Sequence, residues 1–180
     1  MGSGGVGKSS YLIRFATDIF IEDYDPTIED TYRKQIKVDN SLYMVDLLDT
    51  AGYEEWSGMG KWMDLGLKNS DGFIFMFSLT WERSLKDLQE ERAKAMRLQE
   101  RDVIPHVLIG SKVDLEGERE VPFVEAQKVA DSWGCSYFEV SAKANKNVSL
   151  PIEQLVRDIN RIRYPSAQPT ARKQGGCILI

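Results

Sequence analysis

The sequence predicts an α/β fold with a mainly parallel sheet. Short, continuously apolar segments of strand length alternate along the chain with longer segments in which apolar residues recur at helical spacing. Residues 73–77 and 107–109 are the clearest strands, because an uninterrupted apolar run is typical of a strand that is covered on both faces. A third observation is the glycine-rich start at residues 2–9, since loops of this composition join a strand to a helix in α/β folds.

Helices and strands are expected in a regular order after this start. Apolar spacing predicts helices at 10–15, 84–101, 122–133 and 148–163, and strands at 32–38, 42–48, 72–78, 107–109 and 137–140. Asp39, Asn40 and Ser41 are turn formers, so we expect the first two strands to form an antiparallel hairpin. Each later strand is followed by a helix, which is the arrangement of a parallel sheet.

The 180-residue chain has the composition of one globular domain, since 42% of its residues are hydrophobic and 28% are charged. We expect that domain over residues 1–165 and a flexible tail over 166–180, where Ser, Gln, Pro, Thr and Gly are frequent. The net charge of −5 argues against nucleic-acid binding through phosphate neutralisation. Two cysteines are too few for a disulfide framework, and no apolar run reaches the roughly 20 residues that span a bilayer.

The start of the chain, Gly2-Ser3-Gly4-Gly5-Val6-Gly7-Lys8-Ser9, matches the phosphate-binding pattern G-x-x-x-x-G-K-S. Glycines in such a loop let successive backbone N–H groups point at phosphate oxygens, and the helix that follows adds the attraction of its dipole. Lys8 is therefore the expected phosphate partner, and Ser9 is an expected Mg²⁺ ligand.

The glycines at positions 2, 4 and 7 also satisfy G-x-G-x-x-G, the dinucleotide fingerprint. A nicotinamide or flavin enzyme is therefore an alternative, and it needs an acidic residue about 20 positions further on, for which Glu22, Asp23 and Asp25 are candidates. Lys8 directly after the last glycine favours the phosphate-binding loop. Both patterns require a strand before the glycines, whereas only Met1 precedes them in this sequence.

Four further stretches follow the loop in a fixed order: 24–30 (Y-D-P-T-I-E-D), Asp49-Thr50-Ala51-Gly52, Ser111-Lys112-Val113-Asp114 and Ser141-Ala142-Lys143. Together with the loop, this ordered set resembles a Ras-family small GTPase, closest to the Ras and Rap branch, over nearly the whole chain. The resemblance implies a P-loop three-layer sandwich with a mostly parallel sheet and one antiparallel edge hairpin. It implies GTP and GDP as ligands, Mg²⁺ as cofactor and GTP hydrolysis as the reaction.

The resemblance also assigns roles to single residues. Lys8 contacts the terminal phosphates, and Thr27 and Gly52 hold the γ-phosphate through backbone N–H groups. Ser9 and Thr27 coordinate Mg²⁺ through their hydroxyls, and Asp49 holds the ion through water. Asp114 accepts two hydrogen bonds from guanine, which adenine cannot donate. The residues implied to line the nucleotide are Gly2, Gly4, Gly5, Val6, Gly7, Lys8, Ser9, Ser10, Phe20, Tyr24, Thr27, Gly52, Ser111, Lys112, Asp114, Ser141, Ala142 and Lys143.

The sequence departs from the family pattern at four places. Tyr53 stands where the Ras pattern has the glutamine that orients the attacking water, so we expect slow hydrolysis, with a GTP-binding adaptor as the alternative. Ser111 replaces the usual asparagine, whose amide makes more hydrogen bonds than a hydroxyl. The stretch 59–73 is longer than the pattern by about one helical turn of roughly 3.6 residues. The first strand of the family's sheet is expected to be missing, because only Met1 precedes the loop.

The last four residues, Cys177-Ile178-Leu179-Ile180, form a C-a-a-X sequence. This pattern predicts prenylation of Cys177, and the aliphatic last residue favours a geranylgeranyl group. One lipid binds a membrane weakly, and the basic residues between 157 and 173 offer a second, electrostatic attraction. We therefore expect the protein at the cytoplasmic face of a membrane, and the plasma membrane is the membrane we favour.

The effector segment of the family matches Tyr24, Asp25, Pro26, Thr27, Ile28, Glu29, Asp30, Thr31 and Tyr32. The resemblance implies effector proteins with Ras-binding domains, which add a strand beside this edge by main-chain pairing. Exchange factors and GTPase-activating proteins are expected as further classes of partner.

Overall fold

The computed structural model describes residues 1–21, 29–50, 60–101, 103–164 and 177–179. The helices are α1 (Lys8–Thr17), α2 (Gly60–Asn69), α3 (Glu82–Gln99), α4 (Phe123–Trp133) and α5 (Leu150–Arg163), with a 3-10 turn η2 (Glu116–Glu118). The strands are β1 (Glu29–Val38), β2 (Ser41–Thr50), β3 (Phe73–Ser78), β4 (His106–Ser111), β5 (Ser136–Glu139) and β6 (Cys177–Leu179). No helix in the described ranges is long and apolar enough to cross a membrane.

The strands form two hydrogen-bonded sheets of three strands each. In one sheet β3, β4 and β5 run parallel in that order, as the alternation of strands and helices predicts. In the other sheet β2 lies between β1 and β6. β1 and β2 form the predicted antiparallel hairpin, which pairs Val38 with Ser41 and turns at Asp39 and Asn40, both with positive φ.

The alternation of strands and helices in the sequence predicts one sheet, whereas the described strands form two. Within the described ranges no strand lies between β2 and β3 and pairs with both. On the edge of β3 opposite β4, Met1 is the described residue that makes backbone hydrogen bonds to β3. Its N-terminal nitrogen donates to the Ile74 carbonyl oxygen at 2.6 Å, and its own carbonyl accepts from the Met76 N–H at 2.9 Å. A single residue cannot pair with both strands along their length, so the hydrogen-bonded ladder is interrupted there.

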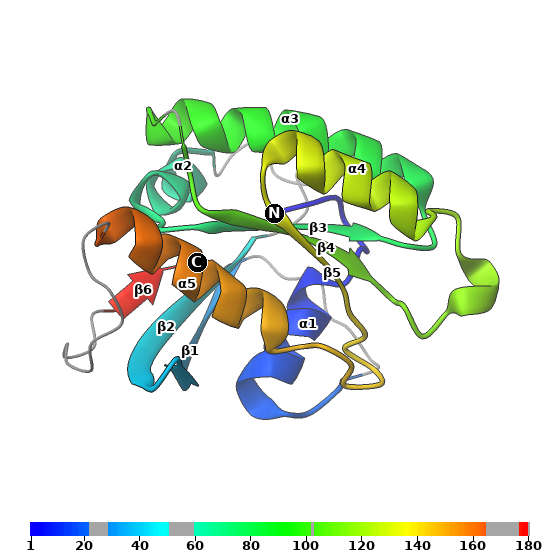
Figure 1. Cartoon of the computed structure of the whole chain (residues 1–180), viewed down its shortest axis with the longest axis horizontal. Helices are drawn as coiled ribbons and strands as arrows, with labels where there is room; N and C mark the ends of the chain where they lie inside the picture. Colours follow the sequence, from blue (N-terminus) through cyan, green and yellow to red (C-terminus); the bar gives the residue numbers. More distant parts are fainter. Residues whose placement is uncertain (22–28, 51–59, 102, 165–176, 180) are drawn as a thin grey trace.

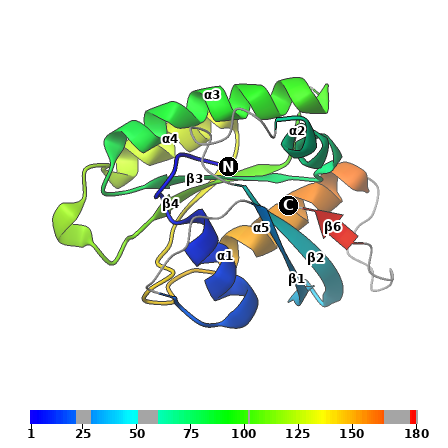
Figure 2. The ribbon, with the colours of Figure 1, turned by 180° about the vertical axis from the view of Figure 1, so that it is seen from behind.

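The core lies on both sides of the β3–β4–β5 sheet. Met76 and Ile109 pack with apolar residues of α1 and α5, whereas Phe75, Phe77 and Leu108 pack with those of α2, α3 and α4. Successive residues of a strand point to opposite faces, which is why each strand contributes to both cores. Figures 1 and 2 show the same division, with α3 and α4 on one side of this sheet and α1 and α5 on the other.

Two elements were not predicted from the sequence. α2 occupies much of the stretch at 59–73 that is longer than the family pattern. β6 lies within the tail at 166–180 for which we expect flexibility, and it pairs in parallel with Met44, Val45 and Asp46 of β2 (Figures 1 and 2). The residues of β6 are Cys, Ile and Leu, which are apolar. Their backbone pairs with N–H and C=O groups on the edge of β2 that faces away from β1.

Candidate functional site

The glycine-rich loop runs from the β3 edge to the start of α1, and two glycines are required by its path. A Cβ atom on Gly2 would lie 2.1 Å from the Met76 carbonyl oxygen, so only glycine fits this close to β3. Gly7 is the N-cap of α1 with φ of 96°, a left-handed conformation that side chains disfavour. A Cβ atom on Gly4 would meet no atom within 4 Å. The loop therefore curves around open space in front of a helix N-terminus, where anions bind favourably.

Lys8 bends back over this loop. Its Nζ donates to the carbonyl oxygens of Gly2 and Ser3 at 2.8 and 2.9 Å. Burial lowers the pKa of Lys8, and the nearby carboxylates of Asp49 and Glu91 oppose this shift. A partly desolvated ammonium group thus lies at the open side of the loop, with one N–H remaining for a further acceptor.

Asp49 is the most unusual polar side chain of the site, because it is only 1% exposed and ends β2 beside the loop. Burial raises its pKa, and a hydrogen bond from the Ser9 hydroxyl and the positive charge of Lys8 oppose this shift. The Ser9 contact is close enough to affect the pKa, but neither carboxylate oxygen has a hydrogen bond of ordinary geometry among the described residues. A buried carboxylate without good donors among the described residues needs a further partner.

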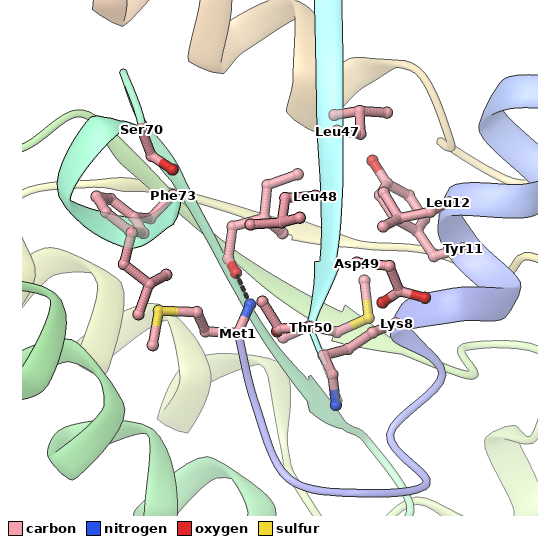
Figure 3. A pocket seen from close by; sticks show the side chains of 13 residues that line it. Met1, Lys8, Tyr11, Leu12, Leu47, Leu48, Asp49, Thr50, Ser70 and Phe73 are labelled. Atoms are coloured by element: carbon pink, nitrogen blue, oxygen red, sulfur yellow. Dashed lines mark hydrogen bonds between the residues drawn. The ribbon is translucent and has the colours of Figure 1, made fainter. Parts of the chain in front are cut away.

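Figure 3 shows Asp49 from β2 and Lys8 from the start of α1 at the same end of a small cavity. Ser9, only 5% exposed, follows Lys8. A hydroxyl and a carboxylate are hard oxygen donors, and this donor type suits Mg²⁺. In the described part of the chain no three His, Cys, Asp or Glu side chains cluster as metal ligands, so a cation here would depend on hydroxyl, ligand or water oxygens.

The end of β4 is bonded directly to the loop. The Ser111 hydroxyl lies 2.6 Å from the carbonyl oxygen of Val6 and 2.9 Å from that of Phe77, and donates toward both. Lys112 has a positive φ of 63°, and its Nζ donates to the Gly5 carbonyl oxygen at 2.9 Å. Asp114 follows on the exposed turn after β4. The residues predicted to recognise the base are therefore attached to those predicted to bind phosphate.

The loop after β5 approaches the same place. Ser141 is fully buried, and its hydroxyl accepts a hydrogen bond from the Ala144 N–H at 2.8 Å, which shapes the turn. The predicted residues Ala142 and Lys143 lie beside α1, because their carbonyl oxygens accept hydrogen bonds from one arginine of that helix, Arg14.

Arg14 is a site residue that sequence reasoning missed. Its Nε donates to the Ala142 carbonyl at 2.7 Å, its Nη2 to the Lys143 carbonyl at 3.0 Å and its Nη1 to the Asp18 carbonyl at 2.6 Å. Its guanidinium carbon also lies 5.9 Å from the centroid of the Phe20 ring. No sequence pattern could indicate this role, because two of the partners are main-chain oxygens more than 120 residues away. Arg14 thereby joins α1, Phe20 and the 142–143 turn.

The contacts described above link Gly2, Gly5, Val6, Gly7, Lys8, Ser9, Phe20, Asp49, Ser111, Lys112, Ser141, Ala142 and Lys143. Of the other predicted nucleotide residues that the structure describes, Gly4 lies in the loop, Ser10 in α1 and Asp114 on the turn after β4. The predicted residues Tyr24, Asp25, Pro26, Thr27, Ile28, Gly52 and Tyr53 lie outside the described residues. Cys177 is on β6, paired with Met44.

The described effector residues lie on an edge strand. The first residues of β1 are Glu29, Asp30, Thr31 and Tyr32. In the described sheet, whose order is β1-β2-β6, β1 has β2 on one side and no strand on the other. Asp30 and Thr31 are exposed. An exposed edge of this kind presents backbone N–H and C=O groups to a partner strand.

The family model described as the Ras family matches residues 1–161, which include the loop, β1 and β2, and the turns after β4 and β5.

Proposed function

This chain belongs to the Ras family of small GTPases, and from that premise we propose that it is a Mg²⁺-dependent switch that binds GTP and GDP and hydrolyses GTP slowly. The observation that carries this proposal is the buried Asp49 carboxylate, which has no good hydrogen-bond donor among the residues that the structure describes and lies beside Ser9 and Lys8 at the open glycine loop. A phosphate group with its cation would give the Asp49 carboxylate a partner of opposite charge.

The phosphate end of the proposed site uses α1 and the loop. Backbone N–H groups of the loop and the N-terminus of α1 would bind phosphate oxygens, and Lys8 would turn its remaining N–H toward them. Ser9, Thr27 and, through water, Asp49 would hold Mg²⁺, which neutralises negative charge on the phosphates when bound. Thr27 and Gly52 would contact the γ-phosphate through their N–H groups, so that its loss releases both segments.

The base end uses the turns after β4 and β5. Asp114 would accept from the N1–H and the exocyclic amine of guanine, while Lys112 and Ala142 close the pocket around the ring. Adenine offers no matching pair of donors, so this carboxylate would select guanine. Arg14 would keep the 142–143 turn in place without touching the base.

For the architecture, we propose the P-loop three-layer arrangement of the Ras and Rap branch. It is supported by helices on both sides of β3–β5 and by the loop between the β3 edge and α1 (Figures 1 and 2). In that arrangement a strand position lies between β2 and β3, where Met1 makes its hydrogen bonds to β3.

Membrane attachment is part of the proposal and rests on the C-a-a-X sequence at Cys177, with geranylgeranyl as the favoured lipid and the cytoplasmic face of the plasma membrane as the location. The electrostatic contribution is smaller than the count of basic residues indicates. Arg157 pairs with Asp39, and Arg161 and Arg163 also have carboxylate partners in the described structure.

The proposed partners fall into three classes. Effectors with Ras-binding domains would pair with the exposed β1 edge, and exchange factors and GTPase-activating proteins would act on the nucleotide site. The second candidate function, a GTP-binding adaptor with little or no hydrolysis, is favoured by Tyr53, because a phenol cannot orient water as glutamine does.

The decisive experiment is to identify the bound nucleotide. The purified protein is denatured, and the released small molecules are identified by mass spectrometry. Lys8→Met is the comparison variant, since it keeps a long side chain but loses the ammonium group together with its hydrogen bonds to the Gly2 and Ser3 carbonyl oxygens. We expect GDP or GTP from the native chain and much less from the variant. Recovery of NAD, FAD or adenine nucleotides instead would refute the proposal. Phosphate release over several turnovers then separates the slow GTPase from the adaptor.

A further inference from the structure

The turn after β5, residues 141–148, is closed by its own hydrogen bonds. Ser141 and Lys146 exchange two main-chain hydrogen bonds of 3.1 and 2.9 Å. The side-chain amide of Asn147 donates to the Glu139 carbonyl oxygen of β5 at 2.9 Å. These contacts fix the shape of the turn and its attachment to β5. They leave open how the turn is held against the phosphate loop, which lies in a distant part of the sequence.

Two side chains of α1 bond to the two ends of this turn. Arg14 donates to carbonyl oxygens near its start, those of Ala142 and Lys143. Tyr11 donates from its hydroxyl to the carbonyl oxygen of Val148, at the end of the turn, over 2.8 Å. Residues three apart are neighbours on the surface of a helix, so one face of α1 bonds to both ends.

The hydrogen bond from Tyr11 lies inside the core. Tyr11 is 1% exposed and Val148 is 5% exposed, and both belong to the hydrophobic cluster that contains Val6 of the phosphate loop. Burial raises the pKa of the Tyr11 phenol above its ordinary value, so the hydroxyl stays protonated and remains a donor. Breaking this contact would leave a buried donor and a buried acceptor unpaired, and that is unfavourable.

α1 also begins at the phosphate loop, because its N-cap is Gly7 and its first residue is Lys8. A displacement of this helix would therefore move both the proposed phosphate end of the site and the turn at the base end. Val148 lies one residue before Ser149, the N-cap of α5. The contact from Tyr11 thus holds the point at which the chain leaves the turn and enters α5.

We propose that Tyr11 is a positioning residue for the turn at 141–148, which it fastens to α1 together with Arg14. This role rests on the proposed GTP-binding function, in which the turn contacts guanine. The two side chains act at opposite ends of the turn, so each one limits its movement when the other is lost. The Tyr11 hydroxyl therefore slows the opening of the turn that lets guanine leave.

Tyr11→Phe tests this role, because it removes the hydroxyl and keeps the ring that packs in the core. We expect GDP to dissociate about fivefold faster from the variant, which corresponds to about 1 kcal/mol. Release of a fluorescent GDP is the measurement, and urea unfolding gives the stability of each protein. Release at the native rate would overturn the proposal.

Trp133→Phe is the matched control for a general loss of stability. Trp133 is 8% exposed and its ring centroid lies 5.7 Å from that of Phe75. It ends α4 just before β5 begins, whereas the turn follows the other end of that strand. This variant should unfold more easily and release GDP at the native rate. Equal acceleration of release in Tyr11→Phe and Trp133→Phe would trace the effect to stability and overturn the proposal.

Magnesium separates the base end from the cation site. Figure 3 shows Tyr11 near Asp49, the proposed partner of Mg²⁺, so an effect through the cation is the competing explanation. A contact that acts at the base end predicts the same fold-acceleration by Tyr11→Phe with Mg²⁺ present and after its chelation. An acceleration that disappears without Mg²⁺ would overturn the proposal.

The double variant Tyr11→Phe, Arg14→Met tests whether the two side chains hold the same turn. One of them still limits the movement of the turn in each single variant. The double variant should therefore release GDP faster than the product of the two single accelerations predicts. A rate equal to that product, or below it, would show that Tyr11 and Arg14 do not act on one turn.

Hydrogen exchange tests the contact without nucleotide release. In Tyr11→Phe the amides between 148 and 153 should exchange about fivefold faster, while those of β4 keep their rates. They include the Glu153 N–H, which donates to the Ser149 carbonyl oxygen at 3.0 Å. Unchanged exchange there would overturn the positioning contact. Faster exchange in a protein from which no guanine nucleotide is recovered would instead refute the proposed function, so the two failures are distinct.

Discussion

The Ser111 hydroxyl donates a hydrogen bond to the carbonyl oxygen of Val6 at 2.6 Å and thereby bonds the end of β4 to the middle of the glycine loop. Both residues are buried, Ser111 at 5% exposure and Val6 at 0%. The family's asparagine would have more donors and acceptors at this position, but the serine makes the contact that links the base end to the phosphate end. The geometry of the loop is therefore coupled through one hydroxyl to that of the turn after β4, which we propose binds guanine.

Ser111→Ala should loosen this link. The substitution leaves the Val6 carbonyl without its donor, and a lost buried hydrogen bond costs about 1–2 kcal/mol of unfolding free energy. We expect GDP to dissociate about tenfold faster, which corresponds to about 1.4 kcal/mol. Fluorescent GDP release and thermal unfolding measure the two effects. Ser111→Thr keeps the hydroxyl and is the control; an alanine variant that behaves like the threonine variant would contradict this role.

Arg14 should position the turn after β5. Arg14→Met keeps much of the apolar stem and removes three hydrogen bonds to main-chain carbonyls, those of Ala142, Lys143 and Asp18. We expect guanine nucleotides to dissociate several-fold faster, because each hydrogen bond from a charged donor contributes about 1.5–3 kcal/mol and part of this loss reaches the turn. Stopped-flow release of GDP is the measurement. Arg14→Lys can donate to fewer carbonyl oxygens, so its rate of GDP release should lie between those of the native protein and Arg14→Met. An Arg14→Met protein that releases GDP at the native rate would exclude the positioning role.

The fold could be predicted from the sequence where local pattern and tertiary position agree. The apolar runs of β3 and β4 lie between two helical layers, so a continuous pattern identified them. α2 was missed because Gly60 and Gly66 weaken its helical pattern. At Gly66 a Cβ atom would lie 2.9 Å from a Leu48 methyl carbon, so a larger residue there would make the Leu48 side chain shift.

The site could be predicted only where a motif carries it. The loop, Asp49 and the 111–114 and 141–143 turns follow from ordered short motifs. Arg14 and β6 could not be predicted, because their partners are main-chain groups that any residue supplies. Interactions with the main chain leave no complementary side chain in the sequence to be recognised.

Asp49→Asn should affect stability and function in opposite directions. Burial raises the pKa of Asp49 above its unfolded value, so its ionised form destabilises the ligand-free fold, and stability falls as pH rises from about 4 through the folded pKa. Removing the charge should stabilise the ligand-free protein at pH 7 by about 1–3 kcal/mol. The same change should weaken Mg²⁺-dependent retention of GDP by about tenfold or more.

Denaturant unfolding of the ligand-free protein and GDP release with and without Mg²⁺ test this pair of effects. Asp46→Asn is a useful control, because Asp46 is also on β2 but pairs with Arg33 on the neighbouring strand. That control should destabilise the protein and leave the Mg²⁺ dependence of GDP release unchanged. An Asp49→Asn protein that is less stable without ligand, or that keeps its Mg²⁺ dependence, contradicts the proposed cation site.

Tyr53→Gln should accelerate GTP hydrolysis. The glutamine amide both donates to and accepts from an attacking water, whereas the phenol of Tyr53 lacks this paired geometry. We expect a single-turnover rate about tenfold or more above that of the native chain, which corresponds to about 1.4 kcal/mol of barrier. Tyr53→Phe is the control and should match the native rate. Equal rates in all three proteins would show that position 53 does not limit hydrolysis.

His106 should make the protein less stable in mild acid. The Nδ1 of His106 is 2.8 Å from the Ile104 carbonyl oxygen, and the ring packs edge-on against Phe75 with 5.6 Å between centroids. Nε2 has no hydrogen-bond partner among the described residues. The pKa of His106 is lowered first by burial and then by the nearby charge of Arg92, and the Ile104 carbonyl and Asp158 oppose this shift. The folded protein therefore keeps the ring neutral.

In the unfolded chain His106 binds a proton near pH 6.5, whereas in the folded chain it binds one only at lower pH. The unfolding free energy therefore falls as the pH decreases below 6.5, until the pH has passed the pKa of the folded state. His106→Phe keeps an aromatic ring and removes the titration. We expect the native protein to lose more unfolding free energy than this variant between pH 7.5 and 5.5, by no more than about 1.4 kcal/mol, which is the limit for binding one proton over one pH unit below 6.5. Urea unfolding measures the difference, and His106→Gln controls for the ring. Parallel pH profiles for the native and both variant proteins would show that His106 does not cause the acid sensitivity.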